Sequence, residues 1–164
     1  MLRGLPKIIL ILSLVVAPLL VSAQSTTIDF GGLKTDTTLP VEVTADSLTV
    51  NQSDGVAVFS GNVLVTQGDM KLSAAEVRVE YGTDGTGISR LFASGGVTLK
   101  AGTDAAEAVE AVYTVATGEV VMQGHVLLTQ GQAAISGEKL VVSLKDGTGK
   151  MEGRVTTTFV PGGN

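Results

Sequence analysis

The sequence has no cysteine, no tryptophan and only one histidine among its 164 residues. Without cysteine there is no disulfide, no thiol nucleophile and no N-terminal cysteine for lipid attachment. His125 has no second histidine or thiolate to complete a tight metal site, so we predict neither a metal nor a cofactor. Paired acids beside aromatic sugar platforms, which glycoside hydrolysis would need, are missing, and we predict no catalytic residue. Aromatic residues make up 4% of the chain, which suits thin stacked strands better than a thick core.

The long apolar run of the sequence stands at its N-terminus. Arg3 and Lys7 precede the apolar residues 8–20, and the small residues Ser22 and Ala23 stand before Gln24. This order is typical of a cleaved secretory signal, and a run of about 13 residues is shorter than the roughly 20 that a spanning helix needs. We therefore expect residues 1–23 to be removed on export to the periplasm, with an uncleaved anchor as the alternative.

The charge balance is acidic, with 16 acidic residues against 11 basic ones. Two of the basic residues lie in the expected signal, so the mature chain is more acidic still, which argues against nucleic acid as a partner. The length suffices for one domain with a core. We expect a flexible segment over 24–39, one β domain over 40–160 and a flexible tail over 161–164.

A glycine-centred cluster recurs four times in the mature chain. The central glycines are Gly61, Gly95, Gly124 and Gly153, which lie 34, 29 and 29 residues apart. A glycine in mid-strand allows a bulge or a sharp bend where a sheet folds over itself, and we favour this structural role over ligand contact. Alternating with the glycines along the chain, one before each of them, are the acids Asp46, Glu76, Glu110 and Glu138. We read these acids as the starts of strands on the solvated face rather than as a cation site.

Alternation of apolar and polar residues predicts that the units between the glycines are strands, and glycine-rich segments such as 53–55 and 82–87 predict the turns. Asp104–Val112 is rich in Ala and Glu, but its place in the repeat favours a strand over a helix. The stacked units would form an elongated sheet whose apolar faces turn towards each other. Small Val and Ala side chains would leave that interior underfilled, which favours a ligand channel. Alternation and repeat position assign the inward side chains to Leu48, Val50, Phe59, Val63, Val65, Val77, Val79, Val97, Leu99, Val112, Met122, Val126, Leu128, Leu140, Val142 and Phe159.

The order of these motifs resembles a known family. Ala45-Asp46-Ser47-Leu48, the segment from Phe59 to Gly68, and Leu72-Ser73-Ala74-Ala75-Glu76 are similar to the OstA-like domain of the LptA family. The same motif occurs again in the segment from Gly124 to Gly131, followed by Ser136-Gly137-Glu138. The resemblance covers roughly residues 40–160. It implies an all-β, half-open antiparallel jellyroll, the β-taco, with an apolar channel that binds the lipid A part of lipopolysaccharide.

The resemblance also implies end-to-end self-association, with an LptC-like inner-membrane protein at one end and an LptD-like outer-membrane protein at the other. Edge strands can pair with a partner by strand addition, and we assign that role to Val41, Val43, Val155 and Thr157. Two alternatives stay open at this point. The first is a membrane-anchored LptC-like component of the same pathway, and the second is a purely structural β-solenoid that carries no lipid.

Overall fold

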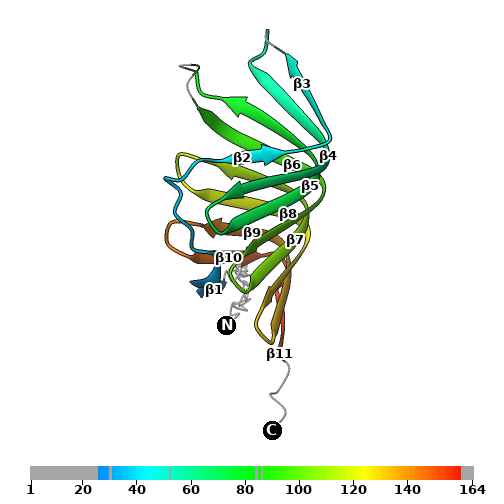
Figure 1. The fold of residues 1–164 in the computed structure, drawn as a ribbon. Helices are drawn as coiled ribbons and strands as arrows, with labels where there is room; N and C mark the ends of the chain where they lie inside the picture. Colours follow the sequence, from blue (N-terminus) through cyan, green and yellow to red (C-terminus); the bar gives the residue numbers. More distant parts are fainter. Residues whose placement is uncertain (1–25, 30, 52, 84, 86, 160–164) are drawn as a thin grey trace, which may run out of the picture.

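The chain folds into one long antiparallel sheet that is bent lengthwise (Figure 1). The computed structural model describes residues 26–29, 31–51, 53–83, 85 and 87–159, so the expected signal and tail lie outside the described residues. In order along the chain the elements are β1 (Thr26–Asp29), η1 (Gly31–Leu33), β2 (Glu42–Thr44), β3 (Ser47–Asn51), β4 (Val56–Gln67), β5 (Met70–Tyr81), β6 (Ile88–Ala101), β7 (Asp104–Thr114), β8 (Glu119–Gln130), β9 (Ala133–Ser143), β10 (Thr148–Glu152) and β11 (Thr156–Phe159).

The sheet is an antiparallel meander at its centre. Strands β4 to β9 pair in chain order, β10 follows β9, and β1 pairs with β10. At the other side β4 pairs with both β2 and β3, and β9 likewise pairs with both β10 and β11. The segment Asp104–Val112 lies within β7, so the prediction of a strand rather than a helix is confirmed. None of the described residues forms a helix long and apolar enough to cross a membrane.

The recurring glycines bend the strands, as the sequence predicted. Gly61, Gly95, Gly124 and Gly153 have φ between 80° and 84°, and the residue after each also has a positive φ. The pairing register shifts at the same level, for example between Ser60 and Val63 in β4 and between Gln123 and Val126 in β8. Two consecutive residues at positive φ interrupt the ladder and turn the strand, which is the geometry of a β-bulge. The bends stack from strand to strand into one continuous crease.

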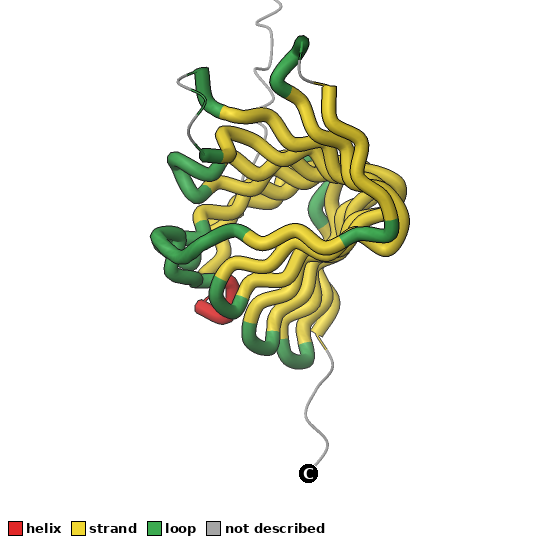
Figure 2. The backbone as a smooth tube through the Cα atoms, turned by 45° about the horizontal axis from the view of Figure 1, so that its top comes forward, coloured by secondary structure: helices red, strands yellow, loops and turns green. Residues whose placement is uncertain are grey.

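The crease divides the sheet into two walls (Figure 2). Wall 1 holds the half-strands that begin with Val63 in β4, together with β2 and β11. Wall 2 holds the half-strands on the other side of the bends, together with β1, β3 and β10. Away from the crease the turns of each wall form a rim (Figure 2). Strand pairing places Gly68 and Gly102 in turns of wall 1 and Gly118 and Gly147 in turns of wall 2. We call the line where the two rims face each other the seam.

The inner faces of both walls form one apolar core. It includes Val65, Leu99 and Leu128 from wall 1 and Val79, Met122 and Val142 from wall 2, each at most 1% exposed. The outer faces alternate with them and are more exposed. Burying these side chains against each other stabilises each by about 1.5–3 kcal/mol relative to exposure, so contact between the walls is a large part of the stability.

The N-terminal segment differs from the expectation of a flexible stretch over 24–39. Residues 26–29 form β1 and residues 31–33 form η1. Leu33 is fully buried, and Thr35 is 9% exposed. Order in this segment comes from distant partners, β10 and the two rims, which the local sequence does not reveal.

Candidate functional site

The interior between the walls is the main candidate site, because an apolar face runs through every strand from β3 to β10. On wall 2 it passes from Leu48 through Phe59 and Val77 to Met122 and Leu140, since each of these belongs to one cross-strand row. Most of the side chains predicted to face inward do lie in this interior, at no more than 1% exposure: Val63, Val65, Val77, Val79, Val97, Leu99, Met122, Val126, Leu128, Leu140 and Val142.

Leu48, Val50 and Phe59 share the inner face but lie at its N-terminal end. Cross-strand pairing puts Leu48 opposite Phe59 and Val50 opposite Ala57, whose side chain is buried. Yet Leu48 is 53% exposed and Val50 57% exposed, because β3 is the last strand of wall 2 at this end. The interior is therefore uncovered at the β3 end. Phe159, at the end of β11, is 71% exposed at the opposite end of the sheet.

The structure places Val112 on the outer face, against the prediction. Its cross-strand neighbours are Phe92 and Val121, while the flanking Ala111 and Tyr113 are buried inside. The bulge between Glu107 and Glu110 resets the alternation of β7, so counting from the repeat assigned the wrong parity. Tyr113 and its cross-strand neighbours Leu91 and Val120 are inner side chains that the prediction did not include. Val120 stands two residues before the predicted Met122 and could have been found from the period-2 pattern of β8.

The prediction of an underfilled interior is wrong for the middle of the sheet. Val79, Leu99 and Met122 are 0% exposed, so no water-sized space touches them. The walls have closed until their side chains meet. A ligand that enters must push the walls apart, and an apolar ligand can do so at small cost because it replaces one set of apolar contacts with another.

A polar cluster at the rim joins the two walls. The Tyr113 hydroxyl of wall 2 donates a hydrogen bond to Gln67 Oε1 of wall 1. Gln67 Nε2 donates to the carbonyl oxygens of Thr37, at 3.0 Å, and Leu39, at 2.8 Å. Gln67 and Tyr113 are each 1% exposed, and burial raises the pKa of the Tyr113 phenol. The pair therefore acts as a neutral, water-excluded latch, which we call the Gln67–Tyr113 latch.

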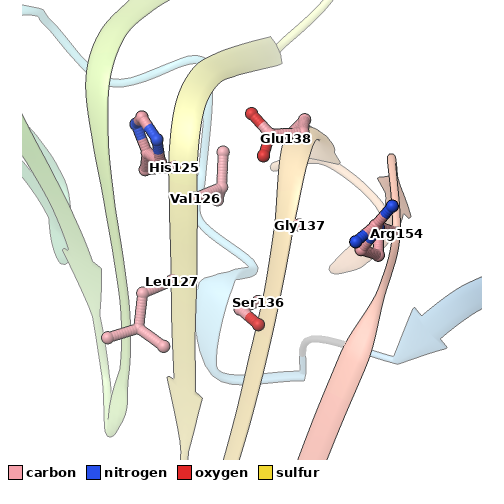
Figure 3. Close-up of a pocket in the computed structure, with 7 residues that line it drawn as sticks. All are labelled: His125, Val126, Leu127, Ser136, Gly137, Glu138 and Arg154. Carbon is pink, nitrogen blue, oxygen red and sulfur yellow. The ribbon is translucent and has the colours of Figure 1, made fainter.

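A shallow pocket on the outer side of the crease is the other candidate (Figure 3). Its volume is about 260 Å³, and His125, Glu138 and Arg154 are its charged or titratable lining residues. All three side chains are exposed. Across the described residues no three His, Asp or Glu side chains gather closely enough to hold a metal ion. Asp46, Glu76, Glu110 and Glu138 all lie exposed near the bends, which agrees with the solvated role predicted for them.

Val41, Val43, Val155 and Thr157, assigned to the assembly edges, lie in or beside the edge strands. Val43 is in β2 and Thr157 in β11, each of which pairs on one side only among the described strands. Val41 and Val155 are partly buried against the core just outside those strands. The four positions therefore fall at the two opposite ends of wall 1.

Comparison with known proteins identifies the family. The model of the LptA/(LptD N-terminal domain) LPS transport protein family matches residues 42–148. The chain is 31% identical over 143 residues to the lipopolysaccharide export system protein LptA of Escherichia coli K12, covering 77% of this chain and 74% of the relative. The chain belongs to this family. An uncharacterized protein of Rhizobium meliloti, R00383, is 28% identical over 150 residues, covering 85% of this chain and 81% of the relative.

The fold of the LptA family is found here as well. The crystal structure of LptH, described as the LptA homologous periplasmic component of the lipopolysaccharide transport device of Pseudomonas aeruginosa, matches with a TM-score of 0.68. The match covers 77% of this chain and 99% of that one at 22% identity. The prediction of an all-β, half-open antiparallel jellyroll is thus confirmed.

Proposed function

We propose that this member of the LptA family is a periplasmic bridge protein. It binds the lipid A part of lipopolysaccharide between its walls and passes it from the inner-membrane to the outer-membrane transport complex. The observation that carries the proposal is the apolar inner face that continues through every strand from β3 to β10. The relatives whose function is named are lipopolysaccharide export or transport proteins rather than enzymes, which supports this role over catalysis.

The physical case rests on the cost of exposing lipid to water. Each methylene of an acyl chain gains about 0.8 kcal/mol on leaving water, so a lipid with several chains cannot cross an aqueous compartment uncovered. An apolar interior along the whole molecule supplies that cover. The chain holds no nucleotide-binding motif, so the work of directed transport comes from another protein.

Neighbouring leucines on opposite faces of β8 test the proposal. Leu128 is fully buried inside, whereas Leu127 is 39% exposed on the outer face. With a photocrosslinking amino acid at either position, we expect lipopolysaccharide adducts in living cells from residue 128 and none from residue 127. Adducts at neither position, or equally at both, would remove the interior from the proposal and leave a structural role.

We further propose that copies of the chain stack end to end, with an LptC-like protein at one end of the row and an LptD-like protein at the other. Four short strands lie at the ends of the walls, β2 and β3 at one end and β1 and β11 at the other, and each pairs on one side only among the described strands. Unpaired backbone groups at such edges are templates for another strand.

Removing β11 should weaken this stacking. Deletion of residues 155–164 takes away the edge strand of wall 1, and we expect the average mass in light scattering to fall towards that of the monomer. Deletion of residues 160–164 alone leaves β11 in place and is the matched control. Equal assembly by both truncated chains would show that β11 is not a docking strand.

A further inference from the structure

The segment Gly32–Leu39, which we call the seam strap, runs between the two rims. Before it, β1 pairs with β10 on wall 2, at the C-terminal end of the sheet. After it, β2 pairs with β4 on wall 1, at the N-terminal end. The chain must therefore cross the seam while running along it, and η1 lies between the two rows of turns (Figure 2).

The strap is bonded to both rims. The Thr35 hydroxyl donates to the Gln67 carbonyl oxygen of wall 1 at 3.1 Å, and the Thr35 amide donates to the Leu144 carbonyl oxygen beyond the end of β9, on the rim of wall 2, at 3.0 Å. The side chain of Gln67 adds its bonds to the carbonyls of Thr37 and Leu39. Thr35 by itself is bonded to both rims, so the strap links wall 1 to wall 2.

The strap also completes the core from the seam side. Leu33 is 0% exposed and belongs to the same apolar cluster as the wall residues. Beneath the strap, the Gln67–Tyr113 latch joins the walls directly. In this state the interior is shut along the seam, while the β3 end is uncovered at Leu48 and Val50.

Lipopolysaccharide cannot occupy the interior of this closed form, given the function proposed above. Its acyl chains belong between the walls, but its sugars are large and hydrated and must stay in water. Strands β4 to β9 each run through the crease from one wall to the other, so the one lengthwise route for the sugars past these strands is the seam. A head group that moves along the seam meets the strap.

We propose that the seam strap is a gate, which shuts the empty protein and lifts from the rims when lipopolysaccharide enters. A few hydrogen bonds and one leucine hold it, and a ligand with several acyl chains offers the walls far more apolar contact than Leu33 does. When no lipid is bound, the strap shields the apolar interior from water. When the strap lifts, the acyl chains enter the interior while the head group stays outside.

A disulfide across the strap tests the gate. The chain has no cysteine, so an introduced pair has no competitor. A Cβ built on Gly32 lies 2.8 Å from Asp104 Cγ, close to where a sulfur at residue 104 would stand, and a disulfide can form there with small movements. Gly32→Cys with Asp104→Cys then fixes the strap to the rim of wall 1, three residues after β1 leaves wall 2.

We expect the oxidised double variant to bind purified lipopolysaccharide at least tenfold more weakly than the same protein after reduction. Gly32→Cys alone, treated identically, is the control and should respond to neither treatment. Equal binding before and after reduction would overturn the gate and leave the proposed function standing. Native protein that binds no lipopolysaccharide would overturn both.

A second variant loosens the strap and should act in the opposite direction. Gln67→Leu with Tyr113→Phe removes the latch and the bonds from Gln67 Nε2 without leaving a buried polar side chain. We expect this variant to take up lipopolysaccharide several times faster than the native chain. An unchanged or slower uptake by a folded variant would count against the gate, even if the disulfide variant fails to fold.

Discussion

Replacing Gly95 with Ala should lower the free energy of unfolding by about 3 kcal/mol, because two penalties add at this bend. Gly95 has a φ of 81°, where an L-residue pays about 1–2 kcal/mol. A Cβ at this position would lie 2.6 Å from the Cβ of Ala75, and such overlap in a packed sheet costs about 1–3 kcal/mol. The melting temperature should fall by roughly 10 °C in a chain of this size.

The next residue supplies a matched control for Gly95→Ala. Gly96 has a φ of 85°, but a Cβ built there meets no atom within 4 Å. Asn62 takes the equivalent place in the bend of β4 at a φ of 47°, and Asn is among the residues that tolerate this region best. Gly96→Asn should therefore cost only about 1 kcal/mol, the lower end of the penalty for a non-glycine residue at positive φ. Equal losses from both substitutions would mean that the backbone conformation, and not contact with Ala75, fixes the glycine.

Replacing Leu48 and Val50 together with Glu should lower the affinity for lipopolysaccharide at least tenfold, which is about 1.4 kcal/mol. Both side chains are on the inner face, yet both are more than half exposed in the empty protein. Their carboxylates would cost the fold little, because water still reaches them. An acyl chain that follows the inner face to its N-terminal end would have to strip that water from two charges, which is costly.

Thr49→Glu is the control for this pair, because Thr49 lies between them on β3 and faces the other way. Binding can be measured by titration with purified lipopolysaccharide, and thermal melting shows whether each variant folds. We expect all variants to melt within a few degrees of the native chain. If Thr49→Glu weakens binding as much as the inner pair does, net charge rather than the inner face explains the loss.

The bent sheet could be predicted because its determinants are local and repeated. Strands β4, β6 and β8 bend at a glycine, and a Cβ on Gly95 would overlap Ala75, which shows why the residue there must be glycine. Each strand must also alternate between a wet and a dry face. Glycine spacing and period-2 patterning were therefore enough to predict the bent sheet and most of the side chains on its inner face. Val112 was assigned to the wrong face because the register shift at the crease resets the alternation of β7 between Ala108 and Ala111, and β7 has no glycine there to mark it.

Other features depend on contacts between distant residues. The ordered conformation of Leu33 and Thr35 depends on contacts with Gln67 and Leu144 and on the pairing of β1 with β10. The sequence of residues 32–39 does not predict those partners. The packing of the two walls against each other is also a contact between residues that are distant in the sequence. Small side chains do not by themselves leave a gap, because the two halves of a creased sheet can approach until they touch.

The pairing of β1 with β10 also affects the order in which the chain can fold. Thr26 pairs with Met151, near the far end of the described chain. The hairpins from β4 to β9 join residues that are close in sequence and can form early, whereas contacts between distant residues must first close a long loop. β1 is the first of the described strands to be synthesised, but it has no strand to join until β10 exists. The first of these strands is thus among the last to take its place, and the seam closes over a sheet that is already assembled.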